Sequence, residues 1–313
     1  MQIALTTELP AEGFKRLAER GIGDLLLVIG NCQDESWKNA EVLVSTFDYK
    51  VSREIIEAMP KLRLIANFGA GFNNIDLEAC EARGIRVTNT PQPVIEPTAE
   101  LAFALMIDIA RRVSEFDRTV RARKAQFGVM RNLSHSLYGK TLGILGMGRI
   151  GQALARRAKA SGMKIIYTNR HQLSADIEVL YNAQYVDFQT LLQDSDFLSL
   201  NLPYTPEVHH IIGKPELGMM KRSAYLINTA RGAHVREEAL VEALRNGIIA
   251  GAALDVYEFE PKISEDLLTL PNVVLSPHTG TGTWEGRIAM CENVCDNIIA
   301  FAEGRTKDMN IVI

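Results

Sequence analysis

The chain has 313 residues, a formal net charge of −4 at pH 7 and 47% hydrophobic residues. This length allows two domains with separate cores. The mild charge predicts no binding to nucleic acid or to an anionic membrane surface, and no apolar run is long enough to span a membrane. Its cysteines form no CxxC pair and no zinc-ligand set, so we expect free thiols, no metal site and a reduced, cytoplasmic environment. These cysteines are Cys32, Cys80, Cys291 and Cys295.

Strand and helix patterns alternate along the whole chain, which predicts a parallel α/β architecture. In the first third, the predicted strands are 2–5, 25–29, 42–45, 64–67 and 85–88, and the predicted helices are 12–20, 52–59 and 76–83. After Pro91, Pro93 and Pro97, an apolar-striped helix is predicted from Thr98 to about Arg123.

A glycine-rich motif then opens a second series of strands and helices. A short apolar strand from Thr141 leads into Gly146-Met147-Gly148-Arg149-Ile150-Gly151 and then into a helix predicted at 152–161. In such a motif Gly146 makes the tight turn, Gly148 lets the backbone approach a pyrophosphate, and Gly151 lets helix and strand pack closely. The N–H groups and dipole at the helix start attract phosphate. The pattern predicts a dinucleotide site, and a purely structural turn is the alternative.

The strand that follows, 164–168, indicates which dinucleotide is bound. It ends at Asn169 and Arg170, about twenty residues beyond the glycines, where an Asp or Glu would bind the ribose of NAD. No acid stands there. Asn169 can donate to a 2′-phosphate and Arg170 can pair with it, although Arg170 also suits a solvated loop. We therefore expect NADP(H) to be preferred, and NAD(H) use stays open.

The later strands are predicted at 197–200, 224–228, 250–254 and 273–276, and a final helix at about 284–303. A dinucleotide fold rarely follows an unrelated tail, so two domains of Rossmann-like or flavodoxin-like type are expected. The dinucleotide-binding domain would be 97–284. The substrate-binding domain would be discontinuous, with residues 1–96 and 285–313, and a cleft between the domains would hold a small substrate.

Three of these strands end in residues that suit one reaction. Arg231 follows the second, Asp255 and Glu260 follow the third, and His278 follows the fourth. Open α/β sheets bind ligands at such carboxyl ends. An Arg can bind a carboxylate, a His can protonate a carbonyl oxygen, and a nearby acid favours the imidazolium. Each residue alone has a structural alternative in a turn, loop or surface position, but together they predict reduction of a 2-oxo acid.

Six blocks in order resemble the D-isomer-specific 2-hydroxyacid dehydrogenase family over nearly the whole chain: 69–76, 98–100, 146–151, 228–232, 255–261 and 277–278. The resemblance implies that Arg231, Glu260 and His278 are catalytic, with His278 as the acid/base and Glu260 supporting it. It also implies that the N–H groups of Ala70 and Gly71 receive the substrate carboxylate alongside Arg231. A homodimer built through the helix after Thr98 is implied as well.

The cofactor-binding residues expected on this basis come from several strand ends, with Asp255 holding the nicotinamide carboxamide. They are Thr98, Gly146, Gly148, Arg149, Ile150, Asn169, Arg170, Leu202, Pro203, Thr229, Ala230, Asp255 and Gly280. Two departures from the family pattern affect how the cofactor and the substrate would fit. Asn201 stands where the family usually has His, and residues 279–283 depart from its usual Gly-Ser-Ala-Thr.

The Asn169-Arg170 pair resembles the NADP-dependent glyoxylate/hydroxypyruvate and 2-ketogluconate reductase branch. We therefore expect an NAD(P)H-dependent reductase that converts small 2-oxo acids to D-2-hydroxy acids, with glyoxylate and hydroxypyruvate first. A 2-ketogluconate reductase and a D-lactate-type dehydrogenase are the enzymatic alternatives. A dinucleotide-sensing, corepressor-like binding protein is the alternative from another class.

Overall fold

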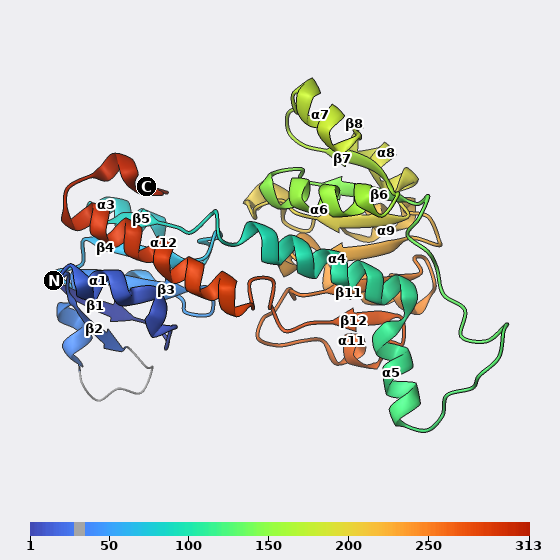
Figure 1. Cartoon of the computed structure of the whole chain (residues 1–313), viewed down its shortest axis with the longest axis horizontal. Helices are drawn as coiled ribbons and strands as arrows, with labels where there is room; N and C mark the ends of the chain where they lie inside the picture. Colours follow the sequence, from blue (N-terminus) through green and yellow to red (C-terminus); the bar gives the residue numbers. More distant parts are fainter. Residues whose placement is uncertain (28–34) are drawn as a thin grey trace. The chain divides into compact units, whose positions relative to one another are not determined.

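The computed structural model describes residues 1–27 and 35–313 and divides into two compact units (Figure 1). The first unit comprises Met1–Pro97 and Thr281–Ile313, and the second comprises Thr98–Gly280. The chain therefore passes between the units at Pro97 and again at Gly280. Cys32 and the end of the strand predicted at 25–29 lie outside the described residues.

The first unit is built on a five-stranded parallel sheet with the order β2-β1-β3-β4-β5. This order is that of flavodoxin-like folds. Every residue of β3 and β4 is buried, because helices cover both faces of the sheet. The strands are β1 (Gln2–Leu5), β2 (Asp24–Leu27), β3 (Val42–Thr46), β4 (Leu64–Phe68) and β5 (Arg86–Thr88).

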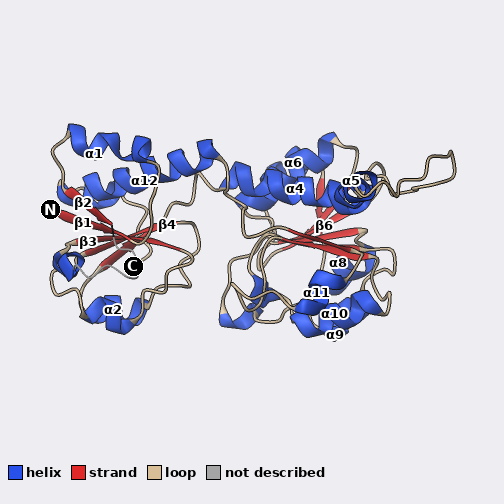
Figure 2. Cartoon of the chain, turned by 90° about the horizontal axis from the view of Figure 1, so that it is seen from below, coloured by secondary structure: helices blue, strands red, loops and turns tan. Residues whose placement is uncertain are grey.

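Figure 2 shows α1 and α12 on one face of this sheet and α2 on the other. The helix predicted at 12–20 is instead a 3-10 turn, η1 (Ala11–Phe14), followed by the short α1 (Lys15–Glu19). The turn packs against α12 so closely that a Cβ at Gly13 would lie 2.1 Å from Cys291 Cβ. The other helices are α2 (Arg53–Glu57), α3 (Leu77–Ala82), α12 (Trp284–Ala302), η2 (Glu35–Asn39) and η5 (Thr306–Asp308).

The second unit contains a seven-stranded parallel sheet with the order β12-β11-β10-β9-β6-β7-β8. The chain runs outward from β6 through β7 to β8 and resumes on the other side of β6 with β9, which is the Rossmann order. The predicted α/β class with two parallel sheets is thus confirmed. The strands are β6 (Thr141–Leu145), β7 (Lys164–Thr168), β8 (Ala183–Tyr185), β9 (Phe197–Leu200), β10 (Tyr225–Asn228), β11 (Gly251–Leu254) and β12 (Val273–Leu275).

The single long helix predicted after Thr98 is wrong. The structure has α4 (Ile95–Arg111) and α5 (Val113–Arg121), separated at Arg112, whose φ of 58° is left-handed. The break is stabilised because the Asp108 carboxylate accepts a 2.7 Å hydrogen bond from the Ser114 N–H at the start of α5. Pro97 is tolerated inside α4 because first-turn N–H groups need no helical partner.

Helices cover both faces of the sheet of the second unit, with α4 and α6 on one face and α9, α10 and α11 on the other (Figure 2). The helix predicted at 152–161 begins earlier, at Arg149, directly after the glycine-rich turn. The helices of this unit after α5 are α6 (Arg149–Ala160), α7 (Ala175–Tyr181), α8 (Phe188–Asp194), α9 (Lys214–Met219), α10 (Glu237–Arg245) and α11 (Glu265–Thr269), with the 3-10 turns η3 (Pro206–Val208) and η4 (Gly232–His234).

The cysteines of the described residues are buried free thiols, as predicted: Cys80, Cys291 and Cys295. Burial raises the pKa of both Cys291 and Cys295 to about 12. No helix among the described residues combines the length and the apolar character needed to cross a membrane.

Candidate active site

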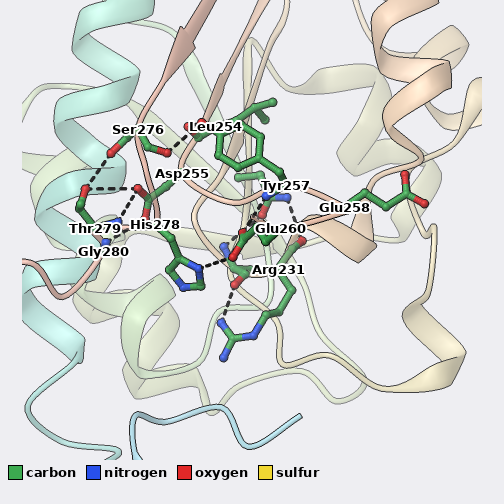
Figure 3. Close-up of polar contacts among 12 residues, drawn as sticks. Arg231, Leu254, Asp255, Tyr257, Glu258, Glu260, Ser276, His278, Thr279 and Gly280 are labelled. Carbon is green, nitrogen blue, oxygen red and sulfur yellow. Dashed lines mark hydrogen bonds and ion pairs between the residues drawn. The ribbon is translucent and has the colours of Figure 1, made fainter. Parts of the chain in front are cut away.

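The ends of β10, β11 and β12, three neighbouring strands of the second unit, carry the predicted catalytic side chains (Figure 3). His278 Nδ1 lies 2.7 Å from Glu260 Oε2. Arg231 and Glu260 are close enough that each charge acts on the pKa of the other group. The structure thus brings together an acid, a histidine and a guanidinium that are separated by up to 47 residues in sequence.

Burial and the histidine act in opposite directions on Glu260. Burial alone would raise the pKa of this carboxyl, but the hydrogen bond and charge of His278 hold the pKa below its ordinary value. The N–H of Tyr257, which donates to Glu260 Oε1 at 2.8 Å, and the charge of Arg231 act in the same direction as His278. Burial lowers the pKa of Arg231, and Glu260 opposes that effect. Glu260 is therefore a carboxylate at neutral pH, beside a histidine.

The backbone of His278 is held in an unusual conformation. Its φ is 52°, a left-handed value that costs energy in a residue other than glycine. Its N–H donates to the carbonyl oxygens of Asp255, at 2.8 Å, and Ser276, at 3.1 Å. The Asp255 side chain accepts hydrogen bonds from the N–H groups of Thr279 and Gly280, both at 2.8 Å. Asp255 thus fixes the loop that presents the histidine.

The turn that carries Arg231 is held by two residues that the sequence analysis left without a role. The Asn228 side chain accepts from the Ala230 N–H at 3.0 Å and donates to the Arg231 carbonyl oxygen at 2.9 Å. A Cβ at Gly232 would lie 1.9 Å from the Tyr257 carbonyl group, so only glycine allows this packing. Both residues lie in the block 228–232 that carries the family resemblance, and this block is the signal by which they could have been found.

Tyr257 is a further residue that sequence reasoning missed. Its hydroxyl donates to the Ser276 carbonyl oxygen at 2.8 Å, while its N–H holds Glu260. It therefore joins the loop of Glu260 to the segment between β12 and His278 (Figure 3). Tyr257 lies in the block 255–261 that carries the family resemblance, but the residue pattern does not indicate the bridge, because the partner Ser276 follows another strand.

The glycine-rich turn between β6 and α6 fits a dinucleotide. Gly146 has a φ of 96°, and a Cβ there would lie 2.8 Å from the Leu202 nitrogen, at the point where the strand order reverses. A Cβ at Gly151 would lie 2.5 Å from the Gly146 oxygen, whereas one at Gly148 would meet nothing within 4 Å. The space over Gly148, at the start of the α6 helix, suits a phosphate group. Arg149 and Ile150 form the first turn of this helix.

The end of β7 lies against the same turn. Asn169 Oδ1 accepts a 2.7 Å hydrogen bond from the Met147 N–H, which leaves the Asn169 amide nitrogen as the group able to donate to a ligand. Arg170 is exposed and forms no hydrogen bond or ion pair with any residue that the structure describes. Its charge nevertheless acts on Glu207.

The other expected cofactor residues follow neighbouring strands or pack beside them. Leu202 and Pro203 follow β9, Thr229 and Ala230 follow β10, and a Cβ at Gly280 would lie 3.5 Å from Thr98. Thr229 Oγ1 and Asn201 Oδ1 are buried and have no hydrogen-bond partner among the described residues. Buried polar atoms normally have partners, so these two are suited to a polar ligand.

Ala70 and Gly71, the predicted substrate-binding residues, belong to the first unit and lie in the loop that follows β4. Within residues 1–27 and 35–313, no three His, Cys, Asp or Glu side chains form a group that could hold a metal ion.

A Rossmann sheet with this turn and a His–carboxylate pair at neighbouring strand ends is typical of nicotinamide-dependent dehydrogenases, and comparison with known proteins agrees. Residues 103–280 match the D-isomer specific 2-hydroxyacid dehydrogenase, NAD binding domain. A glyoxylate reductase of Thermococcus litoralis is 50% identical over 275 residues, which cover 86% of this chain and 83% of that protein.

Two solved structures of similar fold hold different cofactors. The NADPH-dependent glyoxylate/hydroxypyruvate reductase of Sinorhizobium meliloti, in complex with NADP and malonate, is 32% identical with a TM-score of 0.85, covering 96% of this chain and 93% of that one. The D-lactate dehydrogenase of Aquifex aeolicus, complexed with NAD and lactic acid, is 29% identical with a TM-score of 0.88 and covers 99% of both chains. This chain belongs to the D-isomer specific 2-hydroxyacid dehydrogenase family and is an NAD(P)-dependent oxidoreductase.

Proposed function

We propose that the protein reduces glyoxylate and hydroxypyruvate to the corresponding 2-hydroxy acids and prefers NADPH. The observation that carries the reaction type is the 2.7 Å contact between His278 and Glu260, with Arg231 at the end of the adjacent strand. The names of the Thermococcus and Sinorhizobium relatives support the choice of substrate.

The side chains divide the work of the reduction. When bound, the reduced nicotinamide supplies a hydride to C2 of the substrate. His278, held at Nδ1 by Glu260, uses Nε2 to deliver a proton to the carbonyl oxygen, and the Glu260 carboxylate stabilises the imidazolium. Arg231 binds the substrate and stabilises the negative charge that develops on that oxygen. The N–H groups of Ala70 and Gly71 receive the substrate carboxylate.

The preference for NADPH rests on Asn169 and Arg170. The Asn169 amide nitrogen can donate to a 2′-phosphate, and the exposed Arg170 guanidinium can pair with it. We expect Arg170→Ala to raise the KM for NADPH at least tenfold more than the KM for NADH, because only NADPH carries the phosphate. Arg222→Ala, which removes an exposed arginine elsewhere in the second unit, is the control. Equal KM values for the two cofactors in the unaltered protein would disprove the preference.

The substrate is tested by steady-state rates with glyoxylate, hydroxypyruvate, pyruvate, 2-ketogluconate and phenylpyruvate, each with NADPH and with NADH. We expect the highest kcat/KM with glyoxylate and hydroxypyruvate, and D-glycerate as the product from hydroxypyruvate. The Aquifex structure favours D-lactate formation from pyruvate as the second candidate. A clear preference for pyruvate or phenylpyruvate, or no reduction of any acid, would overturn the proposed substrate class.

We also propose that the enzyme is a homodimer formed through α4, α5 and the segment that follows them. The support is a group of exposed apolar side chains in residues 113–138, which we call the arm: Val113, Val120, Phe127, Val129, Met130, Leu133 and Tyr138.

A further inference from the structure

The loop after β4 in the first unit is held by side-chain amides on successive peptide groups. Asn67, the fourth residue of β4, is only 1% exposed. Its Nδ2 donates to the carbonyl oxygens of Gly69, at 3.1 Å, and Gly71, at 2.8 Å. The intervening carbonyl oxygen, that of Ala70, accepts a 2.9 Å hydrogen bond from Asn89 Nδ2. Three consecutive carbonyl groups are therefore occupied.

The orientation of both amides is itself fixed by neighbours. The buried Ser45 hydroxyl donates to Asn67 Oδ1 at 3.2 Å, which turns the Asn67 NH₂ group toward the loop. Asn89 is held through its backbone, because its N–H donates to the Asn310 carbonyl oxygen and its own carbonyl oxygen accepts from Asn297 Nδ2. The amide donors are thus anchored to the strands and to α12, not to the loop.

Fixing a carbonyl group also fixes the N–H group of the same peptide, because the trans peptide is planar and the two point in opposite directions. The three occupied carbonyl groups therefore set the directions of the N–H groups of Ala70, Gly71 and Phe72. None of these N–H groups donates a hydrogen bond to any acceptor in the part of the chain that the structure describes. Three oriented N–H groups without an acceptor are available to bind an anion.

We propose that Asn67 and Asn89 are positioning residues, which hold the loop so that its N–H groups are preset to bind the substrate carboxylate. This inference rests on the proposed function, because the ligand is the carboxylate of the 2-oxo acid. A Gly-Ala-Gly loop by itself is flexible and would lose conformational freedom on binding the ligand. The side-chain amides of Asn67 and Asn89 hold this loop in its binding conformation before the ligand arrives.

The test uses the full-length protein with Asn67→Ala and Asn89→Ala. These neutral changes remove the donors without adding a charge that would repel the ligand. Asn89 is only half-buried, so its variant is expected to fold even if the Asn67 variant does not. The matched control is Asn272→Ala, since Asn272 Nδ2 also donates to two carbonyl oxygens, those of Leu244 and Ala250, within the second unit.

Binding of oxamate, a carboxylate next to a carbonyl that is not reduced, is measured by calorimetry on the cofactor-saturated protein. We expect its Kd, and the KM for glyoxylate, to rise about tenfold or more in both variants. The Kd for the cofactor should be unchanged and kcat should fall less than the KM rises. Asn272→Ala should behave as the unaltered protein. In the unaltered protein, oxamate should slow amide hydrogen exchange at residues 70–72.

Unchanged oxamate Kd in folded variants would overturn the positioning role, and so would unchanged exchange at residues 70–72 in the unaltered protein. A general disruption of the fold would instead lower kcat and weaken cofactor binding together, which also contradicts the inference. If the unaltered protein binds oxamate and the variants bind it weakly, the positioning role stands even if no 2-oxo acid is reduced. That last result would disprove only the proposed function.

Discussion

At the scale of single residues, Glu260 and His278 depend on each other. His278 holds the pKa of Glu260 low against the effect of burial, so the carboxylate is charged in the state in which the proposed mechanism places a proton on His278. The same linkage bears on stability. Because the pKa of Glu260 is depressed in the folded protein, its stabilising contribution is present above the ordinary pKa of a glutamate. That contribution is lost as the pH falls through the lowered value.

We predict that His278→Ala lowers kcat by about 100- to 10,000-fold, the usual contribution of a general acid. The protein should keep its fold, because His278 lies in a loop at the end of β12. His209→Ala is the control, since His209 is an exposed histidine of the same unit that is not part of the proposed site. Steady-state rates and circular dichroism would check both variants, and a kcat near normal for His278→Ala would refute its role as the acid.

Glu260→Gln should lower kcat less than His278→Ala does, and it should change the pH dependence of the rate. Reduction requires the protonated histidine, so its rate falls as the pH rises. Glutamine keeps the shape but removes the negative charge that favours the imidazolium. The fall in rate should therefore begin at a lower pH in the variant than in the unaltered protein. The measurement is kcat/KM for glyoxylate as a function of pH, and superimposable profiles would show that the two groups are not coupled.

At the scale of elements, the three strand-end loops of the site are joined by Tyr257 and Gly232. Tyr257 contacts the loop after β10 through Gly232, holds Glu260 in its own loop, and donates to Ser276 after β12. The parallel strands β10, β11 and β12 set the spacing of the loops, and these contacts set their orientation. The arrangement of the proposed site therefore depends on packing between loops as well as on Arg231, Glu260 and His278.

We predict that Gly232→Ala destabilises the protein by about 1–3 kcal/mol, because its Cβ would overlap the Tyr257 carbonyl group. Gly218→Ala is the matched control. Gly218 lies in α9, and a Cβ there would meet nothing within 4 Å, so this change should stabilise by about 0.4–1 kcal/mol. Urea unfolding measures both free energies. If the Gly232→Ala and Gly218→Ala variants have the same free energy of unfolding, the two loops do not pack as closely at Gly232 as the structure indicates.

At the scale of the whole molecule, the arm is the surface at which we expect another protein chain to bind. Phe127 is 91% exposed and Val129 is 95% exposed, and Figure 1 shows α5 and the loop after it reaching away from the sheet of the second unit. Grouped apolar side chains at a surface mark interaction sites. A second copy of the chain is the partner that we propose. The cytoplasmic location suggested by the cysteines stays a prediction.

Analytical ultracentrifugation of the unaltered protein should give the mass of a dimer. A double variant, Phe127→Ser with Met130→Ser, should shift the equilibrium toward the monomer, because it removes apolar surface from the proposed interface. Val179→Ser changes an exposed apolar residue of α7, outside the arm, and should leave the dimer intact. A monomeric unaltered protein, or a double variant that remains fully dimeric, would rule out this interface.

Most of the fold could be predicted from local patterns. The glycine-rich motif, the strands 164–168 and 197–200, and the strand ends that carry Arg231 and His278 are all visible in sequence, because each pattern repeats within a few residues. The convergence of Glu260 and His278 could also be predicted, because the carboxyl ends of parallel strands lie at one edge of a sheet. The order of the strands within each sheet could not. The family resemblance pointed to the same catalytic set.

Other features were decided only by contacts between distant segments. The break at Arg112 depends on the bond between Asp108 and Ser114, and the three-residue β8 is too short to show a pattern of its own. Tyr257 joins the loops that follow two strands, and the amides of Asn67 and Asn89 act on a loop whose carbonyl groups carry no sequence signal. The sequence by itself determined which reactive side chains the protein has and which reaction they suit, because the type of each side chain can be read position by position. Only the tertiary structure decided how these side chains and the nearby peptide groups are oriented, because their hydrogen-bond partners come from other strands and loops.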